Sequence, residues 1–172
     1  MHVVFLRAVN VGTTNRCQPA AIARQLSKFG VINIGAVGTF VVQEDVAEST
    51  LRAAIAKKLS FQCEIMICPA RDVLQLSALN PFSVQNGEDA VRFVSVLAHR
   101  LTSPPPTPLC FPSSGEWGMK VIEIRGRFVL GMYRRQMKAT SYLGKFEKQL
   151  GVAATTRNWN TIQKVLQALK NG

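Results

Sequence analysis

Residues 31–43 read VINIGAVGTFVVQ, two β-branched runs on either side of the glycine at position 38. β-Branched residues favour extended backbone, and a glycine permits the sharp change of direction that joins two strands. The stretch fits either two strands with a tight connection or one long strand bent at Gly35 and Gly38. We favour two strands, because they combine with the segments on either side into a regular order of elements.

The segments that flank this stretch supply a strand and a helix on each side. Residues 3–9 alternate as a strand, and Pro19 opens an apolar stripe of helical spacing that ends before Gly30. A second helical stripe covers residues 51–59, and a strand follows over 63–68. The resulting order, β-α-β-β-α-β, is the split βαβ arrangement of a ferredoxin-like plait, with both helices on one face of an antiparallel sheet.

The second half predicts the same order with one difference. After a short helix over 69–79, we expect strands at 91–98, 119–124 and 127–133, a helix at 141–150, a strand at 152–156 and a closing helix at 159–169. The proline-rich loop Thr102–Pro108 replaces the first helix, since proline cannot continue one. We therefore predict an α+β fold of two tandem ferredoxin-like plaits in one compact body, with residues 1–82 forming the first unit and its trailing helix, and 83–172 the second.

The composition is typical of a soluble globular protein. Of the 172 residues, 47% are hydrophobic and 18% charged, without an apolar run of membrane-spanning length. The first residues read as a strand and not as a signal peptide. The four cysteines are scattered and show neither metal-ligand nor redox spacing: Cys17, Cys63, Cys68 and Cys110. We therefore expect a cytoplasmic protein with no membrane anchor, metal or cofactor.

The positive charge is concentrated in the second half of the chain. Residues 1–86 carry eight Lys or Arg against five Asp or Glu, whereas residues 87–172 carry thirteen against five, which gives +3 and +8 of the formal +11. A predicted hairpin and the segment after it hold a basic patch: Arg125, Arg127, Arg134, Arg135 and Lys138. Such a surface suits nucleic acid or another anionic partner, although solubility alone also produces basic surfaces.

The segment that precedes the closing helix, residues 155–161, reads TTRNWNT and is unusually polar for a connection. Asn158 or Asn160 suits the N-cap of the helix, and Trp159 suits a core anchor. Those roles leave Arg157 and the threonines Thr155 and Thr156 unexplained. A guanidinium and two hydroxyls are groups that grip a phosphate or carboxylate, so this segment is a candidate ligand site.

A second candidate site lies at the end of the first strand. Arg7 belongs to that strand, and Asn10, Asn15 and Arg16 belong to the loop that leads into the first helix. A helix start offers unpaired amides and the positive end of the helix dipole, which together attract anions. The alternative is a polar turn in which asparagine and glycine serve the backbone alone.

Three segments resemble a bacterial family described as a domain of unknown function, DUF1697. Residues 5–12, FLRAVNVG, resemble its opening R-G-I-N-V-G signature, residues 155–161 match its closing T-T-R-N-W-N-T signature, and Asn80-Pro81-Phe82 resembles a third element. The resemblance implies an α+β fold with two ferredoxin-like halves and no established activity. Ala8 replaces a signature glycine, and only a glycine of the family's Q-S-G-N element remains within residues 35–39.

We predict a non-enzymatic binding module for an anionic partner, either a phosphorylated small molecule or nucleic acid. Its site would be one cleft between the two plaits, lined by Arg7, Asn10, Arg157 and Asn158. One alternative is an enzyme of unknown reaction on a phosphorylated or carboxylated small molecule, although no histidine or serine has the neighbours of an activated group. Another alternative is a structural or protein-interaction domain. The sequence indicates no oligomeric state.

Overall fold

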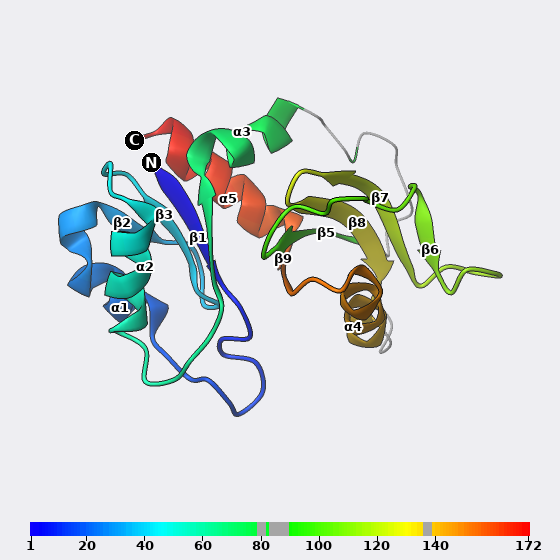
Figure 1. Cartoon of the computed structure of the whole chain (residues 1–172), viewed down its shortest axis with the longest axis horizontal. Helices are drawn as coiled ribbons and strands as arrows, with labels where there is room; N and C mark the ends of the chain where they lie inside the picture. Colours follow the sequence, from blue (N-terminus) through cyan, green and yellow to red (C-terminus); the bar gives the residue numbers. More distant parts are fainter. Residues whose placement is uncertain (79–81, 83–89, 136–138) are drawn as a thin grey trace. The chain divides into compact units, whose positions relative to one another are not determined.

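The computed structural model describes residues 1–78, 82, 90–135 and 139–172. Within these residues, five α-helices and two antiparallel sheets form a mixed α+β fold (Figure 1). The chain divides into two compact units, Met1–Leu79 together with Asn160–Gly172, and Asn80–Trp159. The predicted second unit ran to residue 172, whereas the last helix packs with the first unit.

Up to the helix that trails it, the first unit follows the predicted order of elements, and the last helix of the chain joins it. The elements are β1 (His2–Leu6), α1 (Pro19–Gln25), the 3₁₀ helix η1 (Ser27–Phe29), β2 (Val31–Asn33), β3 (Thr39–Val42), α2 (Glu48–Ala56), β4 (Ile65–Pro69), α3 (Ala70–Ala78) and α5 (Trp159–Lys170), which begins at the boundary. The sheet has the order β2-β3-β1-β4, and all neighbouring strands are antiparallel. The prediction of two strands within residues 31–43 is confirmed.

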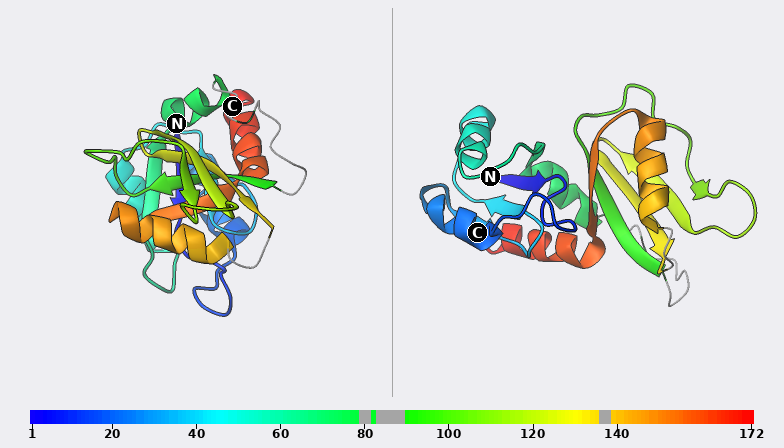
Figure 2. Two further views of the ribbon diagram at one scale, coloured as in Figure 1. Left: turned by 90° about the vertical axis from the view of Figure 1, so that its right-hand side faces the viewer. Right: turned by 90° about the horizontal axis from the view of Figure 1, so that it is seen from below.

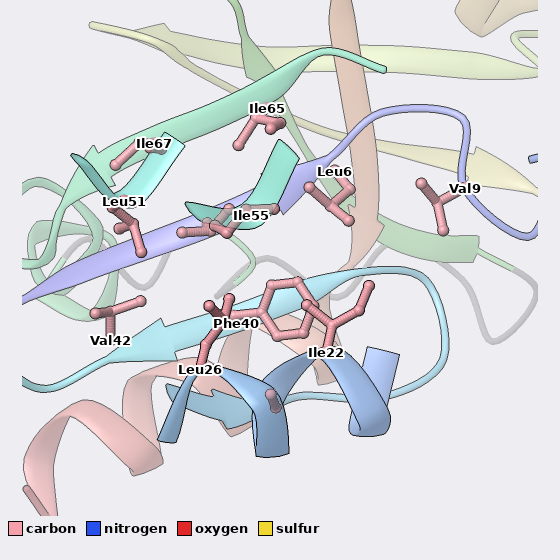
Figure 3. Close-up of a cluster of buried hydrophobic side chains, with 12 residues drawn as sticks. Leu6, Val9, Ile22, Leu26, Phe40, Val42, Leu51, Ile55, Ile65 and Ile67 are labelled. Carbon is pink, nitrogen blue, oxygen red and sulfur yellow. The ribbon is translucent and has the colours of Figure 1, made fainter. Parts of the chain in front are cut away.

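The sheet of the first unit is covered on both faces. Leu6 of β1 points toward α1 and α2, where it lies in one cluster with Ile22, Leu26 and Leu51 (Figure 3). Val4 belongs to the same cluster. α3 contacts β1 and β4, and α5 lies on the same side as α3 (Figure 1). Because both faces are covered, β1 is apolar throughout its buried residues and does not alternate with polar ones.

The second unit contains a five-stranded antiparallel sheet and one helix. Its elements are β5 (Ala90–Leu97), β6 (Leu109–Phe111), β7 (Met119–Arg125), β8 (Phe128–Arg134), α4 (Ala139–Leu150) and β9 (Ala154–Asn158), and the strand order is β6-β7-β8-β5-β9. Residues 102–108 form neither helix nor strand, as their prolines predicted. The short strand β6, which follows this loop, was not predicted.

The strand register assigns the side chains of this second sheet to two faces. Phe93, Met119 and Val129 lie on the face that packs with Phe146 of α4, and Figure 2 shows α4 along that face. The intervening residues, such as Leu130, lie on the face opposite α4. No helix among the described residues is long and apolar enough to span a membrane.

Candidate functional site

Arg7, which directly follows β1, contacts Glu64 through both its backbone and its side chain. Its backbone N–H donates to the carbonyl of Glu64 at 3.0 Å, and its Nε lies 3.8 Å from the Glu64 carboxylate. The two side chains are 37% and 47% exposed, so solvent screens this ion pair. The residue predicted to meet an anion therefore lies beside a carboxylate of its own unit.

Asn10 holds the loop after β1 together through both ends of its side-chain amide. Its Nδ2 donates to the carbonyls of Cys17 at 3.0 Å and Ala36 at 2.7 Å, and its Oδ1 accepts from the Cys17 N–H at 3.0 Å. The amide thus takes the place of a strand neighbour for Cys17. Its polar atoms serve the backbone, which supports the interpretation of this loop as a polar turn.

The other predicted residues of the loop fit the same interpretation. Asn15 Nδ2 donates to the Ala8 carbonyl at 3.2 Å, and the Asn15 carbonyl accepts from the Asn10 N–H at 3.1 Å. Ala8, Asn10 and Asn15 have φ of +55°, +55° and +51°, the left-handed region that asparagine tolerates better than most residues. Arg16 is exposed. α1 is only seven residues long, and Gln18 at its N-cap makes no side-chain cap.

The connection between β2 and β3 lies directly beside this loop. The Gly38 carbonyl accepts from the Leu6 N–H at 2.8 Å, and the Ala36 carbonyl accepts from Asn10. The residues that stand where the family has its Q-S-G-N element are therefore neighbours of the opening signature. In this chain the two loops expose apolar side chains there, with Val11 63% and Val37 37% exposed.

The closing motif is divided between a strand and a helix. Residues 155–158 belong to β9, and Trp159 begins α5. Thr155 and Arg157 pair with Val96 and Val94 on the face opposite α4, whereas Thr156 pairs with Ser95 on the other face. The Thr156 and Ser95 hydroxyls are 2.6 Å apart. Because strand neighbours alternate, Thr155 and Arg157 share one face of the sheet and Thr156 lies on the other.

Arg157 is a buried cation with hydrogen bonds inside its own strand. The side chain is 6% exposed, and its Nη1 donates to Thr155 Oγ1 at 2.8 Å and to the Thr156 carbonyl at 3.0 Å. Burial lowers the pKa of Arg157 to about 10, so the guanidinium keeps its charge at neutral pH. Asn158, the exposed residue before α5, is placed where the predicted N-cap would stand.

The predicted cleft required residues from both halves of the chain. Arg7 and Asn10 belong to the first unit, and Arg157 and Asn158 belong to the second. Their convergence stays a prediction. The third resemblance element, Asn80-Pro81-Phe82, lies outside the described residues except for Phe82, whose ring centroid is 5.1 Å from that of Trp159. Trp159 therefore makes an aromatic contact, as its predicted anchoring role required.

The predicted basic patch is spread over the two ends of the β7–β8 hairpin. Arg125 and Arg127 flank its turn at Gly126, and Arg134 and Arg135 follow at the opposite end of β8. A seven-residue strand spans about 20 Å, so these are two separate groups. Lys138 lies outside the described residues.

The basic residues at the turn are joined by one that the sequence prediction missed. The Arg100 guanidinium approaches Gly126 so closely that a Cβ at that position would be 3.7 Å from Arg100 Nε. Arg127 Nε donates to the Leu97 carbonyl at 2.8 Å, and Arg125 Nε is 2.9 Å from the Glu123 carboxylate. We call Arg100, Arg125 and Arg127 the turn group. Only strand pairing reveals it, because Arg100 follows β5, which pairs with β8.

The other end of the hairpin combines a cation with an aromatic ring. The Arg134 guanidinium lies over the Trp117 ring, 4.9 Å from its centroid, and is paired with the Glu116 carboxylate. The Arg134 N–H also donates to the Gly118 carbonyl at 2.8 Å, which fixes the start of β7 to the end of β8. We call Trp117, Arg134 and Arg135 the open-end group. Trp117 escaped prediction because it stands outside every signature.

The first unit also contains two partly buried cysteines, Cys17 and Cys63, and a hollow. Burial raises the pKa of the Cys17 and Cys63 thiols above the ordinary value, which disfavours the reactive thiolate. A hollow of about 450 Å³ is lined by Ala56, Leu59, Ser60, Phe61, Gln62, Cys63 and Ile65, none of them a predicted site residue. In the described part of the chain, no three His, Cys, Asp or Glu side chains gather as metal ligands would.

The family model described as "Protein of unknown function (DUF1697)" matches residues 1–110, and the chain belongs to this family. The matched segment includes the opening signature and ends before the closing motif. Among solved structures, a conserved bacterial protein from Streptococcus pneumoniae, SP0830, is similar in fold, with a TM-score of 0.57 and 14% identity over 98% of this chain and 97% of that chain. No curated protein matches the chain.

Proposed function

We propose that this protein is a cytoplasmic, non-enzymatic binding module for a partner that carries phosphate groups, and that the second unit holds its binding surface. The observation that carries the proposal is the turn group. Arg125 and Arg127 flank the β7–β8 turn at Gly126, the Arg100 guanidinium lies beside that glycine, and Arg100 and Arg125 are exposed. The Glu123 carboxylate offsets part of the charge of Arg125.

The chemistry of the turn group favours phosphate over other anions. A guanidinium presents a planar fork of N–H donors that matches two phosphate oxygens. The bond from Arg127 to the Leu97 carbonyl holds one of these side chains against the sheet. Residues 87–172 carry thirteen Lys or Arg against five Asp or Glu, so the long-range field of this half also draws in anions.

The proposal is tested with the double variant Arg100→Gln, Arg125→Gln. Fluorescence anisotropy of a labelled twelve-nucleotide DNA strand, recorded from 50 to 200 mM NaCl, gives affinity and salt dependence. We expect roughly tenfold weaker binding and a salt slope reduced by about 1.4, because each phosphate contact on a single strand contributes about 0.7 to that slope. Competition by adenosine triphosphate reports whether a small phosphorylated molecule occupies the same site.

A matched control separates a local site from general charge. The variant Lys164→Gln, Lys170→Gln removes two positive charges from exposed positions of α5, in the first unit. We expect it to bind almost as the unchanged protein does. An equal loss in both variants would contradict a site at the turn group. Absence of binding by the unchanged protein to either probe would overturn the proposal in favour of an enzyme or an interaction domain.

We also infer that both units are variants of the ferredoxin-like plait. The order β2-β3-β1-β4 of the first sheet is the one that two interlocked βαβ units produce, and its helices α1 and α2 share one core cluster. The strands β7-β8-β5-β9 of the second sheet repeat this order, with β6 added at the edge and a loop where the first helix would stand.

A further inference from the structure

The turn group and the open-end group are connected by basic residues on one face of the second sheet. Arg125 pairs with Phe128 and Lys120 with Met132. On β8, Arg134 lies six residues beyond Phe128 and two beyond Met132. Even spacing along β8 places all three on the face opposite α4. We call Lys120, Arg125 and Arg134 the hairpin row. A register shift between Val121 and Glu123 brings Lys120 and Arg125 onto this common face.

The hairpin row is accessible to a partner at both ends. The side chain of Arg125 is 49% exposed and that of Arg134 is 31% exposed, and Lys120 between them is partly exposed. Glu123 lies on the same face beside Arg125. The row therefore offers cations over the length of the hairpin, about 20 Å, with the Glu123 carboxylate near the turn and the Glu116 carboxylate at the open end.

The open end adds a planar surface to this row of charge. The Arg134 guanidinium is stacked over the Trp117 ring at 4.9 Å and is held there by Glu116. Trp117 is itself only partly buried. Guanidinium planes and aromatic rings are the groups on which proteins stack unpaired bases. A small phosphorylated molecule bound at the turn group would not reach this surface.

We infer that the partner is single-stranded nucleic acid, which lays its backbone along the hairpin row and stacks a base at Trp117 and Arg134. This inference rests on the proposed function and specifies its ligand. About 20 Å corresponds to roughly six nucleotides at the 3.4 Å rise of one stacked strand, which lies within the site sizes of single-strand binders. In a duplex the bases are paired and stacked, so their faces are closed to Trp117.

Trp117 fluorescence provides the test. The chain has two tryptophans, so the background variant Trp159→Phe leaves Trp117 as the only reporter. We expect a twelve-residue oligothymidylate to quench this fluorescence. An abasic strand with the same phosphates should bind at least fivefold more weakly and should not quench it, because it has no base to stack on the aromatic ring. Equal quenching by both strands, or equal affinity for a twelve-base-pair duplex, would overturn the inference.

Two substitutions in the unmodified background separate stacking from charge. Trp117→Ala is expected to weaken oligothymidylate binding about tenfold without changing the salt slope, whereas Trp117→Phe retains a ring and most of the affinity. If Trp117→Ala binds normally while the Arg100→Gln, Arg125→Gln variant is weak, the stacking inference fails and the proposed function stands. If the arginine variant also binds normally, the proposed function itself fails.

Discussion

At the scale of single residues, Asn10 is the side chain whose loss is expected to disturb the first unit most directly. Asn10→Ala removes the side-chain hydrogen bonds to the N–H and the carbonyl of Cys17 and to the carbonyl of Ala36. It also places an alanine at a φ of +55°. We expect a loss of about 2 kcal/mol in the free energy of unfolding, measured by urea denaturation. Asn10→Gly should recover about 1 kcal/mol of this, because glycine tolerates positive φ. If Asn10→Ala changed the free energy of unfolding by less than about 0.5 kcal/mol, the hydrogen bonds of Asn10 would not stabilise the first unit as described.

Arg157 predicts a pH dependence at alkaline pH. Burial lowers its pKa from the ordinary arginine value to about 10, so between these two values the unfolded chain binds more protons than the folded one. Its contribution to the free energy of unfolding therefore rises with pH, by up to about 1.4 kcal/mol per unit, and is lost as the pH falls through 10. Urea unfolding at pH 9 and 11 should show the unchanged protein gaining about 1 kcal/mol relative to Arg157→Met. A constant difference between the two proteins would show that Arg157 has the same pKa in both states.

At the scale of single residues, the sequence identified the residues with special roles, but it did not predict what each of their side chains contacts. The amide of Asn10 and the capping position of Asn158 follow from local chain geometry, which sequence patterns reflect. Arg157 was expected to face a ligand together with Thr155 and Thr156, but strand alternation separates the threonines. Whether a polar strand residue points to solvent or into the core depends on what covers the sheet, and one short segment carries no information on that.

At the scale of secondary-structure elements, we expect substitution by alanine to change the free energy of unfolding in opposite directions at two glycines, one in a strand and one in a helix. Gly131 lies in the central strand β8, where an added Cβ would be 2.6 Å from both the Lys120 carbonyl and the Phe93 ring. We expect Gly131→Ala to lower the free energy of unfolding by about 2 kcal/mol or more through overpacking. Gly144 of α4 has no neighbour within 4 Å, so Gly144→Ala should raise it by about 1 kcal/mol through helix propensity. Thermal unfolding of both variants tests the pair, and destabilisation by Gly144→Ala would contradict the described environment of α4.

The elements themselves were largely predictable because their apolar periods are regular. The helix over 141–150, for instance, is found as Ala139–Leu150, and the hairpin turn falls at Gly126. β6 was missed because it is three residues long, too short for a period, and exists only through its pairing with β7. Arg100 was missed for a related reason, since the pairing of β5 with β8 brings it to the hairpin. Trp117 was missed because it stands outside every signature.

At the scale of the whole molecule, the last helix shows that the order of elements along the chain does not decide to which unit a helix belongs. Sequence order suggested that α5 closes the second plait, because it follows β9 directly. Its apolar stripe, with Ile162, Val165, Leu166 and Leu169 all buried, belongs instead to the first unit. Gly172, just beyond the helix, lies beside Gln43, which follows β3. A helical period identifies an apolar face but does not identify the sheet that the face covers.

A pair of core truncations tests this assignment by native-state amide hydrogen exchange. Leu169→Ala removes a side chain from α5 that is 4% exposed, and Phe146→Ala removes one from α4 that is 1% exposed; each is expected to cost about 3 kcal/mol. Because local opening follows the cooperative unit that loses contacts, Leu169→Ala should accelerate exchange mainly in β1, β3 and β4, and Phe146→Ala mainly in β5, β7 and β8. If Leu169→Ala instead accelerated exchange in β5 and β8 and left β1 protected, α5 would belong to the second unit, as the order of the sequence first suggested.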